Sequence, residues 1–420
     1  MKVAIVGTGI AGMGCGYFLH GQHELTFYEK NSYIGGHTNT VTVDEEGTQI
    51  PIDTGFIVYN EVTYPNLTRL FAKLEVKTRP TSMSFSVQHL PSGLEFSGSG
   101  LRGLFAQVRN LFSLRYLQML MQINRFNSQC VEVLENKRYA GYTLADYVRE
   151  KGYGEDFLHR YIVPMSSAVW STEPDLMLEF PAVTLVRFFH NHGFLRMYTQ
   201  LQWRTVVGGS HNYRDRLIAP FRERIRVGVA AVAVERVGAG VVVRASDGTA
   251  ERYDAAILAC HADESLALLG STATPLERSL LGCFRYQRNL AVLHTDESVM
   301  PKSRRAWASW NYRLEYDSTG KLRPSTIYYM NSLQQVSQKK NYFISINDPG
   351  NVSADRVLYK VEYAHPIYSL EAVKAQQRLP ELNASGPVYF CGSYFRYGFH
   401  EDAFVSAIQV CEQLKGGKVW

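Results

Sequence analysis

The sequence predicts an α/β protein in which a Rossmann-like domain, with a parallel sheet and a β-meander, is joined to a second region of mixed helices and strands. Three segments predict this class: an apolar strand with a glycine-rich turn at 3–12, a β-meander at 225–258, and an apolar strand followed by a helix at 387–414. At 420 residues the chain is longer than one ordinary domain. Because the sheet signals lie at both ends and in the middle, we expect that domain to be discontinuous.

Composition fits a globular protein, with 45% apolar residues, 20% charged residues and a net charge of +5. No stretch reaches the roughly 18 consecutive apolar residues that span a bilayer. The charge is modest and the arginines are scattered, so nucleic-acid binding is not expected. The six cysteines form no C-x-x-C pair, which indicates free thiols and a cytoplasmic location. The glycines at 7, 9, 12 and 14 argue against an export signal.

The first turn, Gly7-Thr8-Gly9-Ile10-Ala11-Gly12, follows the buried strand 3–6 and has the G-x-G-x-x-G spacing of a Rossmann-like dinucleotide site. Gly7 permits the tight turn, Gly9 lets the backbone approach a pyrophosphate, and Gly12 lets helix and strand pack closely. The amides of Ile10 and Ala11 then face the phosphates.

A second strand, 23–29, ends in Glu29, which lies 17 residues after Gly12. A carboxylate there can accept hydrogen bonds from both hydroxyls of an adenosine ribose. The alternative is a solvated carboxylate at a strand end.

The residues after Glu29 carry a resemblance to a family. Lys30-Asn31-Ser32-Tyr33-Ile34-Gly35-Gly36-His37-Thr38 resembles the second signature of the FAD-dependent superfamily of amine oxidases, phytoene-type desaturases and protoporphyrinogen oxidase. That signature ends in Gly-Gly-Arg, and the arginine meets the pyrophosphate; His37 takes its place here. The resemblance implies FAD as the cofactor, with Lys30, Gly36, His37 and Thr38 beside it.

Other segments extend the resemblance along the chain. Gly55-Phe56, after a predicted hairpin at 41–53, resembles the stretch that passes the flavin ring. The start of the meander, near Ala231, would offer backbone atoms to adenine, and 254–259, ending at Ala259, resembles the next strand of the dinucleotide domain.

The C-terminal strand 387–393 and the helix after Tyr397-Gly398-Phe399-His400 match the superfamily in spacing. The resemblance implies that this helix points its N-terminus at the flavin, with Gly392, Ser393, Phe399 and His400 in contact. Ser393 and Asp402 depart from the usual residues. The aromatics could equally be core residues, and His400 could be catalytic or only cap the helix.

The resemblance divides the chain into an amine-oxidase-like FAD-binding domain (1–66, 205–270 and 383–420) and a substrate or cap domain (67–204 and 271–382). In the cap we expect a helix at 66–76, a hairpin at 82–97 and mostly helix at 101–126. This last segment carries four arginines and no acid. It either covers the substrate domain or makes peripheral contact with the inner face of the membrane.

Local strings such as Phe189-His190-Asn191-His192-Gly193 and Ala306-Trp307-Ala308-Ser309-Trp310 resemble a bacterial group of amine-oxidase-like flavoproteins. Relatives of that group are associated with cyclopropane-fatty-acid-synthase-like methyltransferases, which implies a lipid substrate and a methyltransferase partner. A metal site at His190 and His192 is not expected, because no carboxylate or cysteine lies at ligand spacing.

The function expected is FAD-dependent desaturation of a modified fatty acyl chain, with His400 and Tyr59 as the candidate catalytic residues. The strand 289–294 holds no lysine, whereas amine oxidases commonly place one beside the flavin. The alternatives are an amine oxidase with Phe399 in an aromatic cage, an FAD-dependent isomerase, and a non-redox lipid-binding flavoprotein.

Overall fold

A computed structural model describes residues 1–195 and 201–420 and confirms the α/β class. Its central sheet is wholly parallel, in the order β10-β2-β1-β14-β20. The strands are β1 (Lys2–Val6), β2 (Glu24–Glu29), β10 (Ile225–Val227), β14 (Ala255–Leu258) and β20 (Val388–Phe390). Parallel strands end at one edge of a sheet, so their carboxyl ends meet there, where ligands of such folds bind.

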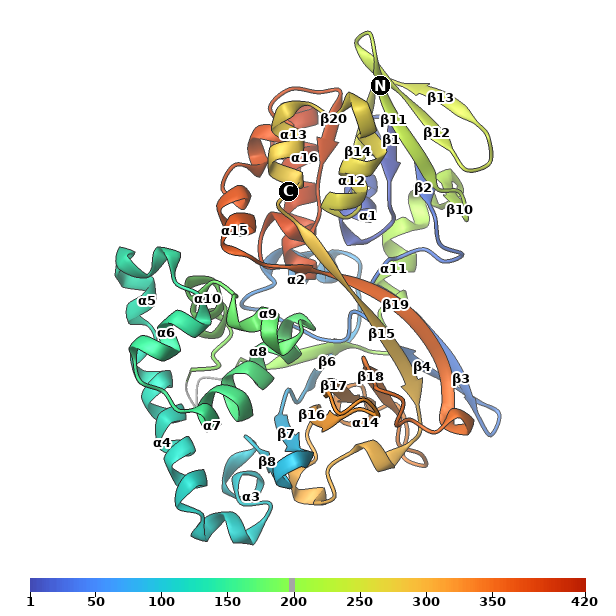
Figure 1. Cartoon of the computed structure of the whole chain (residues 1–420). Coiled ribbons are helices and arrows are strands. Elements are labelled where there is room, and N and C mark those ends of the chain that lie inside the picture. The colour runs from blue at the N-terminus through green and yellow to red at the C-terminus, as the bar shows by residue number, and fades with distance from the viewer. Residues whose placement is uncertain (196–200) are drawn as a thin grey trace.

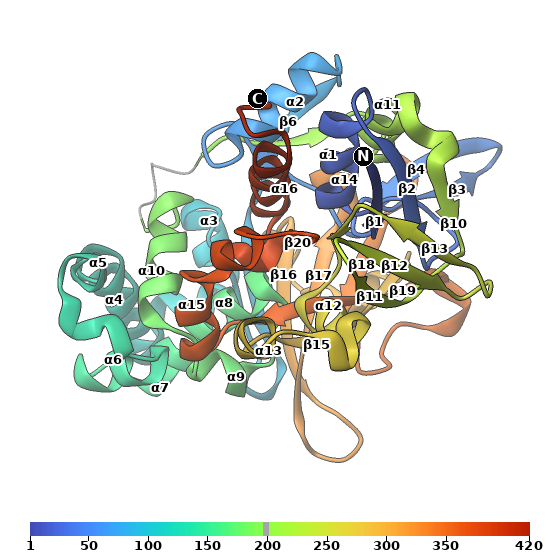
Figure 2. The same ribbon diagram turned by 90° about the horizontal axis from the view of Figure 1, so that it is seen from above.

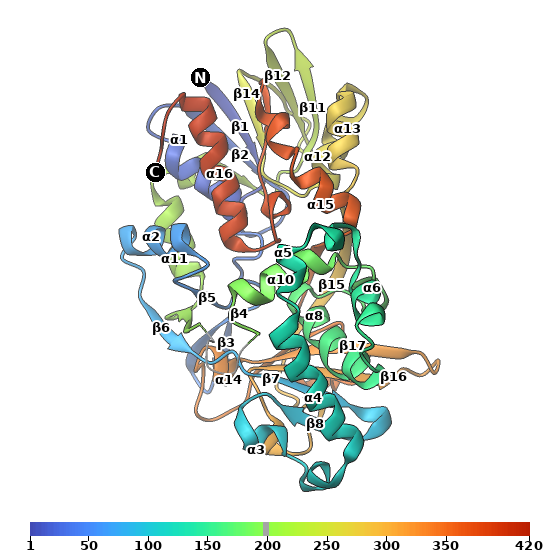
Figure 3. The same cartoon turned by 90° about the vertical axis from the view of Figure 1, so that its left-hand side faces the viewer.

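The parallel sheet is the middle of three layers (Figures 1 and 3). Helices α1 (Ile10–Leu19), α11 (His211–Ile218) and α16 (His400–Lys415) cover one face, against Val3 and Ile5 of β1. A three-stranded meander, with α12 (Ala262–Leu269) and α13 (Pro275–Leu281), covers the other face, against Ala4 and Val6. The meander strands are β11 (Ala231–Val237), β12 (Gly240–Ala245) and β13 (Ala250–Tyr253).

The meander is shorter than predicted. Residues 225–227 form β10, which pairs with β2 in the parallel sheet instead of opening the meander. Gly228, with φ of +74°, turns the chain between the two sheets. At its other end the predicted meander stops at Tyr253, where β13 ends. The following strand, β14, pairs with β1 in the parallel sheet, which agrees with the resemblance of 254–259 to the next strand of that sheet.

The cap contains a seven-stranded mixed sheet in the order β19-β15-β18-β17-β16-β7-β8. Its two longest strands, β15 (Arg285–His294) and β19 (Val357–Ile367), run from the layers around the parallel sheet into the cap (Figure 1). The others are β7 (Phe85–His89), β8 (Leu94–Ser97), β16 (Trp310–Tyr316), β17 (Leu322–Tyr329) and β18 (Phe343–Ile346).

Helices of the cap gather on one side of this sheet (Figures 1 and 2). The predicted helix at 101–126 is interrupted, because a 3-10 turn at Val108–Phe112 separates α3 (Gly100–Leu104) from α4 (Leu114–Gln129). The others are α5 (Glu132–Glu135), α6 (Leu144–Glu150), α7 (Glu155–Phe157), α8 (Val163–Trp170), α9 (Pro174–Leu178) and α10 (Ala182–Asn191). No helix in the described ranges is long and apolar enough to cross a membrane.

Smaller elements join the two parts. The predicted hairpin is β3 (Thr40–Glu45) with β4 (Thr48–Asp53), and the predicted helix near 66–76 is α2 (Pro65–Lys73). A three-stranded sheet holds β5 (Tyr59–Asn60), β6 (Thr78–Thr81) and β9 (Trp203–Val206). The remaining helices are α14 (Met330–Leu333) and α15 (Leu370–Gln376).

Candidate functional site

A cavity of about 1060 Å³ extends from the carboxyl edge of the parallel sheet into the cap. That volume is at the upper end for small-molecule sites and is large enough for a dinucleotide and a substrate together. All but two of the residues predicted to contact the cofactor line it: Gly7, Gly9, Ile10, Ala11, Glu29, Lys30, Gly36, His37, Gly55, Phe56, Ala231, Ala259, Gly392, Ser393, Phe399 and His400.

The three glycines of the first turn have the separate roles that their spacing predicts. Gly7 has φ of +97°, which a side chain would strain. A Cβ on Gly12 would lie 2.0 Å from the carbonyl oxygen of Gly7, so this glycine serves packing and does not line the cavity. A Cβ on Gly9 would meet no atom within 4 Å, because it would point into open space.

Helix α1 begins at this open space. Gly9 is its N-cap and supplies no side-chain hydrogen bond, and the first turn holds no acidic residue. The amides of Ile10 and Ala11 line the cavity without an acceptor among the described residues. Unpaired amides at a helix N-terminus bind phosphate, so this end of the cavity fits a pyrophosphate.

Glu29 lies beside the same turn and is 4% exposed. Its carboxylate accepts hydrogen bonds from the amides of Thr8, at 3.1 Å, and Asn31, at 2.8 Å, which fix its orientation toward the cavity. The Thr8 hydroxyl also donates to Oε2, so Oε1 is the oxygen that retains a lone pair for a ribose hydroxyl. Lys30 is turned outward to an ion pair with Glu264.

His37 contributes no charge, in contrast to the arginine that the family signature places there. It is half-buried, and desolvation together with the neighbouring His365 lowers its pKa well below the usual range. Its ring stacks on Tyr363, with centroids 4.6 Å apart. A neutral imidazole can donate one hydrogen bond to a phosphate or flavin oxygen, but it offers no ion pair.

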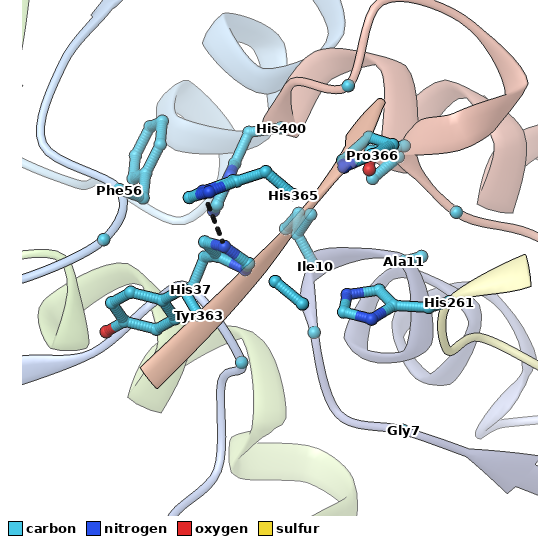
Figure 4. Close-up of a pocket in the computed structure, with 18 of the residues that line it drawn as sticks. Gly7, Ile10, Ala11, His37, Phe56, His261, Tyr363, His365, Pro366 and His400 are labelled. Carbon is cyan, nitrogen blue, oxygen red and sulfur yellow. Dashed lines mark hydrogen bonds between the residues drawn. The ribbon is translucent and has the colours of Figure 1, made fainter. Parts of the chain in front are cut away.

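A chain of hydrogen bonds determines which nitrogen of His37 carries the proton, and Figure 4 shows its last bond, between His365 and His37. The amide nitrogen of Asn289 donates to Nδ1 of His365 over 2.7 Å, so His365 carries its proton on Nε2. That Nε2 lies 3.3 Å from Nε2 of His37, which therefore accepts. Burial lowers the pKa of His365 to about 4, which keeps the pair neutral. His37 is left with Nδ1–H as its donor.

Sequence reasoning missed His365, Asn289 and Tyr363. They lie on β15 and β19, and β19 is more than 300 residues after His37. A lone histidine in an alternating strand gives no signal of its own. Only the antiparallel register, which places Asn289 opposite Tyr363, brings them to the site.

The N-terminus of α16 forms the opposite wall of the cavity, with Gly398, Phe399 and His400 lining it. Asp402, in the first turn of the helix, accepts hydrogen bonds from the amides of Tyr397 and Phe399. Burial raises the pKa of Asp402 to about 7 in spite of these bonds. Near neutral pH the Asp402 carboxylate is therefore only partly ionised, and its negative charge only partly cancels the helix dipole that stabilises negative charge at this wall.

The side chain of His400 is held by protein partners. Its Nε2 lies 3.1 Å from both the Thr38 hydroxyl and the Tyr213 hydroxyl, and its ring stacks on Phe56 at 3.9 Å between centroids. Burial lowers its pKa to about 3, so it is neutral. This geometry is that of a positioning residue which anchors the start of α16. Thr38 does not line the cavity and acts on it through this bond.

Tyr59 does not reach the cavity, contrary to the expectation that it faces the reacting atoms. It lies on β5, is 2% exposed, and packs edge-on against Phe71 and Tyr64. Its ring belongs to the core that α2 covers. The segment after the flavin-passing strand turns inward at this point, which the sequence pattern could not show.

The cap end of the cavity is apolar and rich in aromatic rings. Its lining comes from β9, β16, β17, α8, α10, α14 and the segments after β4, β6 and α10. It consists chiefly of Ile57, Val58, Met83, Val169, Trp170, Phe188, Phe194, Trp203, Trp310, Tyr328 and Leu333. Among the described lining residues the charged ones are Glu29, Lys30, Glu264, Arg288 and Glu362, none of which belongs to this group. A substrate held there is bound by apolar contact.

Two features of an amine site are missing from the described lining. Lys30 is its only lysine and lies at the ribose end. Phe399, the expected cage aromatic, stacks directly on Phe188 with centroids 5.0 Å apart. Rings at that distance are in contact, so no ammonium group fits between them.

His190 and His192 lie at the end of α10 and not in an open loop. The ring of His192 stacks on Phe188, and its Nδ1 contacts the Phe188 carbonyl at 2.9 Å. No group of three potential metal ligands occurs in the described ranges.

Taken together, the open Gly9 cradle, the unpaired amides and the Glu29 carboxylate fit FAD. A family model for flavin-containing amine oxidoreductases matches residues 10–281, more than half of the chain. No curated protein sequence matches the chain.

Solved structures with the same fold include enzymes of different chemistry. A putrescine oxidase bound to putrescine has a TM-score of 0.69 at 11% identity, covering 99% of each chain. Cyclohexylamine oxidase from Brevibacterium oxydans IH-35A has a TM-score of 0.66 at 16% identity, covering 99% of each chain. A fatty acid isomerase from P. acnes that produces CLA has a TM-score of 0.66 at 13% identity, covering 96% of each chain.

Proposed function

The chain belongs to the flavin-containing amine oxidoreductase family and is an FAD-dependent oxidoreductase; on that basis, we propose that it oxidises a long apolar substrate such as a fatty acyl chain. The observation that carries the proposal is the cap end of the cavity, which aromatic and aliphatic side chains line without a charged group. The reaction proposed is desaturation, in which a carbon–carbon single bond becomes a double bond as one hydrogen leaves as a hydride to the flavin and the other as a proton released to solvent.

Residues already described would hold the cofactor. The amides of Ile10 and Ala11 would bind the pyrophosphate, Glu29 the ribose, and His37 an oxygen of the dinucleotide through Nδ1–H. When bound, the isoalloxazine supplies the acceptor for a hydride. The dipole of α16, aimed at the cavity, stabilises the negative charge that such an acceptor gains.

The cap residues would orient the substrate and exclude water. An acyl chain lying along Trp170, Phe188 and Trp310 gains about 0.8 kcal/mol for each buried CH₂ group, so length rather than charge would determine affinity. Phe56 and His400, fixed by stacking and by Thr38, would keep the adjoining wall rigid. A dry, rigid wall protects a hydride transfer from side reactions.

Product analysis tests the proposal. The FAD-loaded protein is incubated with phospholipids that carry methylated or cyclopropanated acyl chains, and the chains are analysed by mass spectrometry. A product lighter by two hydrogens supports desaturation. An unchanged mass with a moved double bond supports isomerisation. Isomerisation is the second candidate because the chain shares its fold with a fatty acid isomerase. Peroxide release with simple amines alone contradicts both.

A pair of variants tests whether the apolar end binds the substrate. Ser171 lines the cavity beside Trp170 in a left-handed conformation, φ +50°, which aspartate tolerates. Ser171→Asp would therefore introduce a carboxylate there and raise KM for the acyl substrate at least tenfold, without loss of FAD. Gln335→Asp is the matched control, because Gln335 has φ of +51° but is exposed and outside the lining.

A further inference from the structure

The corner between α3 and α4 exposes large apolar side chains that the rest of the fold leaves unpartnered. Phe112 is 84% exposed, Leu114 77% and Leu101 72%, the three highest values among large apolar residues in the described ranges. Val108 and Leu111 are exposed beside them. We call these five residues the apolar corner. Exposure on this scale marks an interaction surface.

The apolar corner is a built feature. Beneath it Tyr116, Met119 and Phe96 form a buried cluster. The Tyr116 hydroxyl donates to the carbonyl of Leu104 over 2.7 Å, which ties α4 to α3. Ser113 caps α4 by accepting from the Tyr116 amide. The turn is therefore held in place while its large side chains face outward.

Basic side chains lie beside the apolar corner, on its own segment and on a neighbouring one. Arg102 and Arg109 are exposed on the same segment, and residues 98–131 contain no aspartate or glutamate. A second segment, which packs against α3 and β8, adds the exposed Lys302 and Arg305. In the described ranges none of these four side chains is paired with an acid. Two acids nearby, Asp156 and Glu297, are paired with Arg115 and Arg304. An apolar group beside basic side chains is complementary to an anionic bilayer surface.

We infer that the apolar corner inserts into the interface of an anionic lipid bilayer. Phe112 and Leu114 would enter the acyl boundary, and Arg102, Arg109 and Arg305 would contact lipid headgroups. The corner lies at the end of the molecule away from the parallel sheet (Figures 1 and 3). β8, which adjoins it, pairs with β7, and β7 pairs with β16, the strand that brings Trp310 to the apolar end of the cavity.

Vesicle sedimentation of the FAD-loaded protein tests the inference. Because the assay measures binding and needs no turnover, its result is independent of the proposed function. The probes are vesicles of phosphatidylcholine alone and vesicles with a third of phosphatidylglycerol. The expected result is binding at least tenfold tighter to the anionic vesicles, and weaker at high salt. Equal binding to both vesicles, or to neither, overturns the inference.

Variants separate insertion from general adhesion. Phe112→Asp with Leu114→Asp should lower the fraction bound at least tenfold. Val62→Asp with Val237→Asp, two exposed positions on other elements and outside the cavity lining, is the matched control and should bind as the wild type does. Unchanged flavin absorbance and Tm show that each variant is folded. If the corner variant binds vesicles normally but dissociates a dimer, the surface is a protein interface and the inference is wrong.

Discussion

The substitution Gly9→Val should weaken FAD binding while leaving the stability of the apoprotein nearly unchanged. Gly9 has φ of −62° and ψ of 177°, a backbone conformation open to valine. Since a Cβ there meets no protein atom within 4 Å, the substitution creates no clash in the apoprotein. Loss of a glycine N-cap lowers the free energy of unfolding by about 1 kcal/mol at most.

The same side chain occupies the space that a pyrophosphate needs. Forcing extra methyl groups into a filled site costs about 1–3 kcal/mol. The pyrophosphate cannot shift away without losing the amides of Ile10 and Ala11, so the upper figure applies. We therefore expect FAD to bind about 100-fold more weakly.

The assay is titration of the apoprotein with FAD, followed by flavin fluorescence, together with the Tm of the apo and loaded forms. At fixed excess FAD, a 100-fold loss of affinity removes about 2.7 kcal/mol of ligand stabilisation. Gly21→Val is the control, because a Cβ on Gly21 also meets nothing within 4 Å but lies in an exposed turn. Full FAD affinity in Gly9→Val would refute the placement of the pyrophosphate.

Three further predictions concern titratable residues. Asp402→Asn should flatten the pH dependence of stability, because the folded-state pKa of about 7 exceeds the ordinary 3.8 and the wild type therefore loses up to about 4 kcal/mol of its free energy of unfolding between pH 4 and 7. Thermal unfolding at pH 5 and 8 checks this, and the same change in Tm with pH in wild type and variant would contradict it. His400→Ala should lower the free energy of unfolding by about 1–3 kcal/mol and leave the shape of the kcat/KM profile from pH 5 to 8 unchanged, since the pKa of His400 is about 3. If the wild-type profile has an inflection in that range and the variant lacks it, His400 is a proton acceptor instead. His365→Ala should weaken FAD binding about tenfold by freeing the tautomer of His37; undiminished affinity in the same titration would show that the pair has no part in holding the cofactor.

The parts of the site that follow a strand directly could be predicted from sequence. The turn at Gly7 and the acid at Glu29 are set by local spacing, because a parallel strand must end at the ligand edge of its sheet. The strand before Cys391 is recognisable for the same reason.

Residues that depend on distant pairing could not be predicted. His365 reaches His37 only through the register of β15 with β19. Residues 225–227 have the composition of a meander strand, and only their pairing with β2 assigns them to the parallel sheet. Tyr59 was placed at the site by its position in the chain, whereas the packing of Phe71 against it decides its role.

The apolar end of the cavity had no sequence signal either. Its aromatic residues come from segments between Met83 and Tyr328, and each is typical of an ordinary core. What distinguishes them is that their rings surround a space that continues from the dinucleotide end.

Anaerobic flavin absorbance near 450 nm tests most directly whether that space selects an apolar substrate. The FAD-loaded protein is mixed in turn with a methylated acyl phospholipid and with putrescine. We expect the lipid to bleach the flavin and the amine to leave it oxidised. Bleaching by putrescine alone would contradict the central claim.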